Sequence, residues 1–228
     1  TPLYSSAASD VYKRQLITIA IFGMWYYARY EGNFLPSPKK TFNPMMLVAI
    51  VILVPGTQFA ANFIANLTGY IRPDWLQQYN ELFETSGITD TTFVTVLYSV
   101  ILAPICEELI FRGVTMRCAR KALPFALANL MQAALFGLFH LNWIQGIYAF
   151  ALGIVLGYVC ECGGSIYYSI GLHLLFNLWG TLSGFFPDPG NSVVVFVIVI
   201  AVTIVSLVVG FVLFNKGRRK LPINSTGI

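Results

Sequence analysis

Long apolar runs constrain this chain more than any other feature of its sequence. Hydrophobic residues make up 57% of the chain and charged residues 11%, whereas soluble domains carry roughly 25% charged residues. About 20 consecutive apolar residues cross a bilayer as one helix. The composition therefore excludes an ordinary soluble domain and a disordered chain. It predicts an all-α fold, a polytopic transmembrane helical bundle of about seven spans, at residues 16–27, 44–67, 91–112, 124–141, 143–160, 165–186 and 192–214.

The N-terminal residues do not fit this pattern. Residues 1–15 carry no fold signal and resemble translated sequencing-adapter sequence, so we expect them to be non-native. The run at 16–27 is too short to cross a bilayer alone and is expected to be a truncated first span. Residues 74–87 have apolar side chains at a spacing that predicts a helix lying at the membrane interface.

The positions of the basic residues predict the orientation in the membrane. Cytoplasmic loops are enriched in Lys and Arg, so the basic tail after the last run places the C-terminus in the cytoplasm. Counting back, two further basic clusters fall on the same side, and the acid-rich loop at 68–90 falls outside. The net charge of +4 is explained by these loops, so we expect a lipid bilayer and no nucleic acid as partner. The three clusters are Lys216, Arg218, Arg219 and Lys220; Arg117, Arg120 and Lys121; and Arg29, Lys39 and Lys40.

A few ionisable residues lie inside the apolar runs, where a charge costs roughly 2.5–3.5 kcal/mol at a helix centre. Glu108 and Arg112 are four residues apart with the acid first, which favours an ion pair on one helix face. Glu107 has no such local partner and is therefore free to act in catalysis. Alternatively, Glu107, Glu108 and Arg112 could together form a structural ion network. Pro104 predicts a kink nearby. The kink could open the helix beside Glu107, or it could serve only the packing of the helices.

Two polar stripes accompany these acids and contain the only two histidines of the chain. Each stripe follows helical spacing and should face the interior of the bundle, because polar groups cannot face lipid cheaply. Glu107 and His140 are equally far from a predicted turn at Leu123–Pro124, so in a helical hairpin both lie about 24 Å from it. The stripes are Asn129, Gln132, Phe136 and His140, and Ser169, His173, Asn177 and Thr181.

These residue types suit hydrolysis of an amide bond without a covalent intermediate. A carboxylate and an imidazole can withdraw a proton from a shared water molecule, while a second imidazole and a carboxamide can donate to an oxyanion. One alternative is zinc held by Glu107, His140 and His173, although no H-E-x-x-H pair is present. Two others are a proton-coupled transporter, for which we find no inverted repeat, and a non-catalytic membrane immunity or scaffold protein.

Three ordered motifs resemble those of the CPBP intramembrane protease family, also called Abi or CAAX prenyl protease type II, which is typified by the Ras-converting endopeptidase. The motifs are Glu107-Glu108-x-x-x-Arg112, Phe136-x-x-x-His140 and His173-x-x-x-Asn177. The resemblance implies a membrane endopeptidase in which Glu107 and His140 activate water and His173 and Asn177 form the oxyanion hole. Glu108 and Arg112 would support the site.

The resemblance also implies that no metal or other cofactor is needed, although the family has often been described as metalloproteases. The expected partner is a peptide or protein substrate, lipid-modified or membrane-bound, and the expected location is the plasma membrane of a prokaryote. Residues 91–186 would form the catalytic core. Residues 16–90 would supply N-terminal spans and an interfacial loop, and residues 187–228 the last span and the basic tail.

Overall fold

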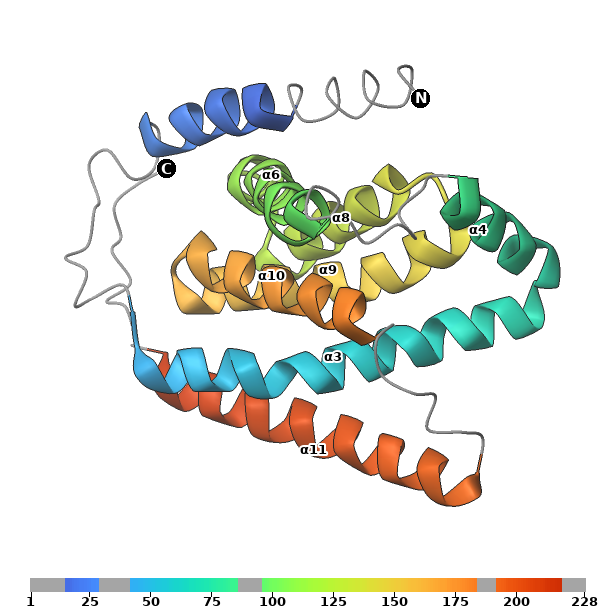
Figure 1. Cartoon of the computed structure of the whole chain (residues 1–228). Helices are drawn as coiled ribbons and strands as arrows, with labels where there is room; N and C mark the ends of the chain where they lie inside the picture. Colours follow the sequence, from blue (N-terminus) through green and yellow to red (C-terminus); the bar gives the residue numbers. More distant parts are fainter. Residues whose placement is uncertain (1–14, 29–41, 86–95, 184–191, 219–228) are drawn as a thin grey trace.

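The computed structural model describes residues 15–28, 42–85, 96–183 and 192–218, which form helices joined by short connections (Figure 1). No strand occurs within these ranges, so the predicted all-α fold is confirmed. In chain order, the elements are a helix at Gln15–Tyr26, α3 (Pro44–Ile71), α4 (Pro73–Thr85), η2 (Leu97–Leu102), α6 (Ala103–Glu108), η3 (Leu109–Met116), α7 (Arg117–Ala119), α8 (Phe125–Phe139), α9 (Trp143–Gly163), α10 (Ile166–Ser183) and α11 (Val193–Gly217).

Three helices of the described ranges are long and apolar enough to cross a membrane, namely α3, α9 and α11. The helix at Gln15–Tyr26 and helix α8 are apolar but shorter. Helices of this length and composition indicate an integral membrane protein, while the count of about seven spans stays a prediction. Of residues 1–15, which are expected to be non-native, residues 1–14 lie outside the described residues and Gln15 begins the first described helix. The basic residues Arg29, Lys39, Lys40, Arg219 and Lys220 also lie outside the described residues.

Helices α3 and α11 lie side by side along one edge of the molecule (Figure 1). They run antiparallel: the carboxamide of Asn43, before α3, donates to the carbonyl of Gly217 at the end of α11 over 2.6 Å. Glycines allow the close contact, since a Cβ at Gly210 would lie 2.6 Å from the side chain of Leu53. Small residues at helix contacts are typical of membrane proteins, where backbones associate by close packing.

A serine of α11 bridges an interruption in the backbone hydrogen bonds in the middle of α3. Pro55 has no N–H to donate within the helix. At the next residue, Gly56, the N–H donates to the hydroxyl of Ser206 over 2.8 Å, and that hydroxyl donates to the carbonyl of Ile52. An uninterrupted helix would pair Gly56 with Ile52 directly. Ser206 is therefore inserted into the hydrogen-bond ladder of α3.

Helices α9 and α10 pack on the inner side of α3, and α8 packs on α9 (Figure 1). The polar stripes lie on α8 and α10. The corner between α8 and α9 is tight, because a Cβ at Gly137 would lie 2.5 Å from the carbonyl oxygen of Gly146. Leu141 turns the corner with a positive φ of 53°, and Asn142 caps α9 through a hydrogen bond from the N–H of Gln145. His140 is the residue that ends α8.

The predicted helix is confirmed as α4, which packs against α9, while its place at the membrane interface stays a prediction. Trp75 of α4 stacks on Trp143 with ring centroids 5.3 Å apart, and the guanidinium of Arg72 lies over the Trp75 ring at 4.2 Å. Arg72 also pairs with Asp74 at 2.7 Å, and this hydrogen bond lowers the pKa of the Asp74 carboxyl. The phenol of Tyr79 hydrogen-bonds Tyr148 of α9, and burial raises the pKa of Tyr79.

We expect Ser206→Ala to lower the melting temperature of the detergent-solubilised protein, because it leaves the N–H of Gly56 and the carbonyl of Ile52 without a partner. Each unsatisfied buried group costs about 1–3 kcal/mol. Thr203→Val is the matched control, because the Thr203 hydroxyl bonds only Val199 of its own helix among the contacts described. Equal melting temperatures for the two variants would contradict this function of Ser206.

Candidate active site

The helix that carries the two acids is irregular in a way that the sequence does not predict. The third apolar run divides into a π-helical segment η2, a short α-helix α6, a second π-helical segment η3 and α7. π-helical turns are rare and occur frequently at functional sites. Glu107 and Glu108 are the last two residues of α6, and Arg112 lies in η3. Pro104 lies where the π-helical register changes to the α-helical one.

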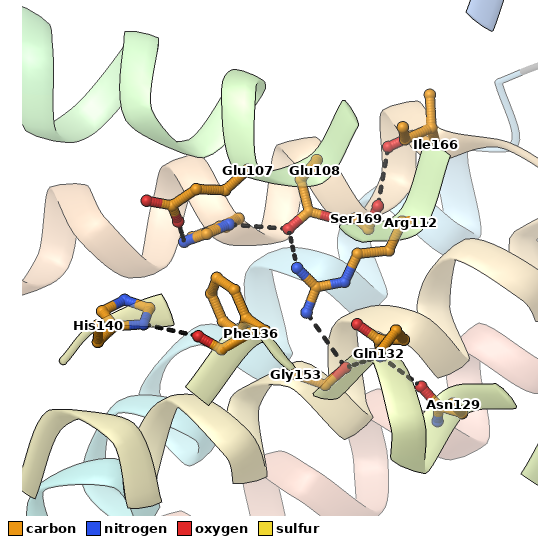
Figure 2. A network of polar contacts seen from close by, with 11 residues as sticks. Glu107, Glu108, Arg112, Asn129, Gln132, Phe136, His140, Gly153, Ile166 and Ser169 are labelled. Carbon is orange, nitrogen blue, oxygen red and sulfur yellow. Dashed lines mark hydrogen bonds and ion pairs between the residues drawn. The ribbon is translucent and has the colours of Figure 1, made fainter. Parts of the chain in front are cut away.

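The predicted ion pair between Glu108 and Arg112 is confirmed. Oε1 of Glu108 lies 2.8 Å from Nη1 of Arg112, and both side chains are fully buried. The guanidinium also donates from Nη2 to the carbonyl of Gly153 in α9 over 3.2 Å, and it lies 4.5 Å from the centre of the Phe136 ring. Figure 2 shows this pair in the middle of a polar network that joins several helices.

The network continues into α8 through two residues of the first polar stripe. Nε2 of Gln132 donates to the carbonyl of Gly153 over 2.9 Å and to Oδ1 of Asn129 over 2.7 Å (Figure 2). Asn129 in turn donates to the carbonyl of Ile154 over 3.0 Å. Both amides are buried, as the stripe predicts. Their role was not predicted: they bind backbone carbonyls of α9, including the one that receives Arg112.

His173 is held by the same carboxylate that pairs with Arg112. Its Nδ1 lies 2.8 Å from Oε1 of Glu108, and its Nε2 lies 3.6 Å from Oε2 of Glu107. An ionised carboxylate only accepts hydrogen bonds, so Nδ1 of His173 carries the hydrogen. The sequence motif predicted the ion pair but not this second partner of Glu108. The other ring nitrogen, Nε2, is thereby directed toward Glu107.

His140 is oriented in the same way from the end of α8. Its Nδ1 lies 2.8 Å from the carbonyl oxygen of Phe136, which can only accept, so Nδ1 is again the donor and Nε2 is left available. Figure 2 shows His140 and Glu107 at the same end of the network. Glu107 interacts electrostatically with both imidazoles, and its side chain remains 17% exposed. The structure thus brings Glu107, His140 and His173 together.

The ring of Phe136 packs against both imidazoles and the guanidinium of Arg112. Its centroid lies 5.0 Å from that of His140 and 5.8 Å from that of His173, both in edge-on geometry. Phe111 packs on the same ring at 5.2 Å. The motif included Phe136 without assigning it a role. Phe136 is 1% exposed and fills the space between the Arg112 guanidinium and the two imidazoles.

Asn177 lies one turn after His173 on α10, but its carboxamide is bound elsewhere. Its Nδ2 donates to the carbonyl of Ser99 in η2 over 2.8 Å. Thr181, the last member of the predicted stripe, donates to the carbonyl of Asn177. A carboxamide has two N–H groups, so one remains for another acceptor. The sequence did not predict that the Ser99 carbonyl binds Asn177. The nearby Pro104 is the one feature that could have indicated it.

The alternative of a zinc site requires Glu107, His140 and His173 to converge as ligands. Within the described ranges, no group of three or more His, Cys, Asp or Glu side chains is arranged to hold a metal ion. The expectation that no metal is needed stays a prediction.

We expect Arg112→Met to destabilise the protein by roughly 3–5 kcal/mol, because it leaves the Glu108 carboxylate buried without its cation. The matched control is Arg120→Met, which removes an ion pair with Glu161 whose side chains are 36% and 34% exposed. Such a pair contributes only about 0–1 kcal/mol. Thermal unfolding in detergent measures both variants. Similar small shifts in both would show that the buried pair is not needed for stability.

Comparison with known proteins identifies one family. No curated protein and no solved structure matches the chain. Residues 89–179 match the family model described as Type II CAAX prenyl endopeptidase Rce1-like, and this range contains Glu107, Glu108, Arg112, His140, His173 and Asn177. As the three motifs predicted, residues 89–179 are similar to the Rce1-like type II CAAX prenyl endopeptidases.

Proposed function

We propose that this protein is a membrane-embedded endopeptidase that hydrolyses peptide bonds with a water molecule activated by Glu107 and His140. Similarity to the family supports a CAAX-protease-like membrane endopeptidase in general. The observation that carries the specific mechanism is the arrangement around Glu107. Its partly exposed carboxylate faces two imidazoles, and each imidazole is held through Nδ1 with Nε2 available.

The first step is deprotonation of water. A water molecule bound to the Glu107 carboxylate can give its proton to that carboxylate, with Nε2 of His140 as a second acceptor. A positioned base of this kind contributes roughly 10²–10⁴-fold to a rate. The hydroxide then attacks the carbonyl carbon of the peptide bond. Protonated Glu107 or His140 returns the proton to the leaving amine, so no covalent intermediate on the enzyme is needed.

The oxyanion that forms in this step is stabilised by His173 and Asn177. In its doubly protonated form, His173 donates from Nδ1 to Glu108 and from Nε2 toward the reacting centre. Charge balance supports this form, because two carboxylates, Glu107 and Glu108, surround one guanidinium, that of Arg112. Buried charges are costly unless paired, and the imidazolium brings the formal charge of the cluster to zero. The second N–H of Asn177 supplies the other donor.

The substrate is a peptide or protein that reaches the site within or beside the membrane. At the corner between α8 and α9, a groove of about 510 Å³ is lined almost entirely by apolar groups, including Leu138, Trp143 and Phe150. Two of its lining residues, Leu138 and Leu141, flank His140 in the sequence. Leu141 at its rim is 95% exposed. Such a groove supports an apolar or lipid-modified segment in the substrate.

The proposed membrane placement follows the helix lengths and the loop charges. Helices α3, α9 and α11 have the length and composition of spans. The two shorter apolar helices, the segment from η2 to α7, and α10 would bring the number to about seven. Lys216 and Arg218 close α11 at its C-terminal end, which supports a cytoplasmic C-terminus.

We expect purified protein in lipid nanodiscs to cleave a quenched fluorescent peptide that ends in a C-a-a-X sequence, tested with the cysteine either farnesylated or unmodified. Glu107→Gln and His140→Ala should each lower kcat by about 10²-fold or more, since each removes a proton acceptor. Glu161→Gln is the matched control, because its carboxylate pairs with Arg120 at the exposed end of α9. Cleavage that survives both site substitutions would overturn the assignment.

The same assay decides the question of metal dependence. We expect cleavage to continue after prolonged treatment with a strong chelator, with unchanged kcat. Loss of activity in the chelator and its recovery on adding zinc would show that the proposed mechanism is wrong and that Glu107, His140 and His173 act as metal ligands in a rearranged site.

A further inference from the structure

The backbone register around Pro104 predicts that one carbonyl beside the site, that of Ser99, lacks a donor within its own helix. In η2 the N–H of Ala103 donates to the carbonyl of Tyr98, five residues earlier. In an α-helical register it would instead have donated to Ser99. The π-helical bond of Ala103 therefore removes the donor that an α-helix would offer to the Ser99 carbonyl.

The next residue cannot supply the missing donor either. Continuing the π-helical register of η2, the carbonyl of Ser99 would receive the N–H of residue 104. That residue is Pro104, which has no N–H. The two effects together leave the Ser99 carbonyl free on the side of the helix that faces α10. In a membrane-embedded segment a free carbonyl of this kind must be satisfied by protein.

Asn177 of α10 satisfies it, with Nδ2 at 2.8 Å from the oxygen of Ser99. A carbonyl oxygen only accepts, so the amide atom in contact is the nitrogen and the orientation of the carboxamide is fixed. Because the amide group is planar, fixing one N–H also fixes the direction of the other. Asn177 is only partly buried and lies one turn from His173 on the same helix face.

We infer that Pro104 is a positioning residue that orients the carboxamide of Asn177 by leaving the Ser99 carbonyl free to receive it. This inference rests on the proposed function for the role of Asn177 as a donor to the oxyanion. It assigns no chemistry to Pro104 itself. The effect of Pro104 passes entirely through Asn177, which distinguishes it from a proline that only bends a helix.

The test is a double-mutant cycle on the detergent-solubilised full chain, with Pro104→Ala, Asn177→Ala and the double variant. In Pro104→Ala the restored N–H competes with Asn177 for the Ser99 carbonyl. We expect kcat for the C-a-a-X peptide to fall by about tenfold with KM little changed, a part of the roughly 10²–10³-fold that one oxyanion donor supplies. In the Asn177→Ala background, Pro104→Ala should have no further effect.

Pro55→Ala is the matched control, because Pro55 also lies inside a helix but its break is bridged by Ser206 far from Asn177 in the sequence. It should leave kcat unchanged. The inference is overturned if Pro104→Ala lowers kcat equally in both backgrounds, or leaves it unchanged while Asn177→Ala lowers it. In either case the proposed function still stands.

A second readout does not depend on any activity. The melting temperatures of the same four proteins form a stability cycle, and we expect the effect of Asn177→Ala to be smaller in Pro104→Ala than in the native background. Additive shifts would overturn the inference. If native protein cleaves no peptide but the melting temperatures are non-additive, the proposed function fails while the positioning of Asn177 by Pro104 stands.

Discussion

The fully buried carboxylate of Glu108 is the group on which the arrangement of the site depends. One of its oxygens accepts both the guanidinium of Arg112 and Nδ1 of His173. Removing a charge from water costs several kcal/mol, so a buried carboxylate persists only with good partners. Arg112 then reaches Gly153 of α9, which also receives Gln132 of α8. A single carboxylate therefore links α6, η3 and α10 directly, and α8 and α9 through Arg112.

The same network explains why the two adjacent acids, Glu107 and Glu108, have different surroundings. Glu108 is enclosed and committed to binding other side chains, whereas Glu107 keeps part of its surface exposed and faces the Nε2 atom of His173. Neighbouring residues on a helix point about 100° apart, which follows from 3.6 residues per turn. Glu108 can therefore hold the framework while the side chain of Glu107 stays partly exposed.

Interrupted helices are a second recurring feature, and two of the interruptions are closed by a side chain from another helix. In α3 the hydroxyl of Ser206 bridges the backbone beside Pro55, and in η2 the carboxamide of Asn177 binds the carbonyl of Ser99 beside Pro104. A bilayer offers no water to such groups. Breaks in the helical ladder therefore become points where two helices are fixed in register.

Sequence patterns predicted the features of the site that depend on the local geometry of a helix. The spacing of Glu108 and Arg112 predicted their ion pair, and the stripe containing Asn129 and Gln132 predicted burial, because both follow from helical periodicity. The contact between Glu108 and His173 joins residues 65 apart and could not be predicted from spacing. The π-helical segments were missed because a regular 3.6-residue period was assumed, and the backbone partners of Gln132 and Asn177 leave no mark in the sequence.

The most direct test of this account is the hydrogen-bonding state of His173, measured by ¹⁵N solid-state NMR of histidine-labelled protein in lipid. The chain has only two histidines, so the His140→Ala variant leaves the signals of His173 alone. The account predicts a hydrogen on Nδ1, in a strong hydrogen bond to a carboxylate. A His173 ring with a bare Nδ1 and its only hydrogen on Nε2 would contradict it.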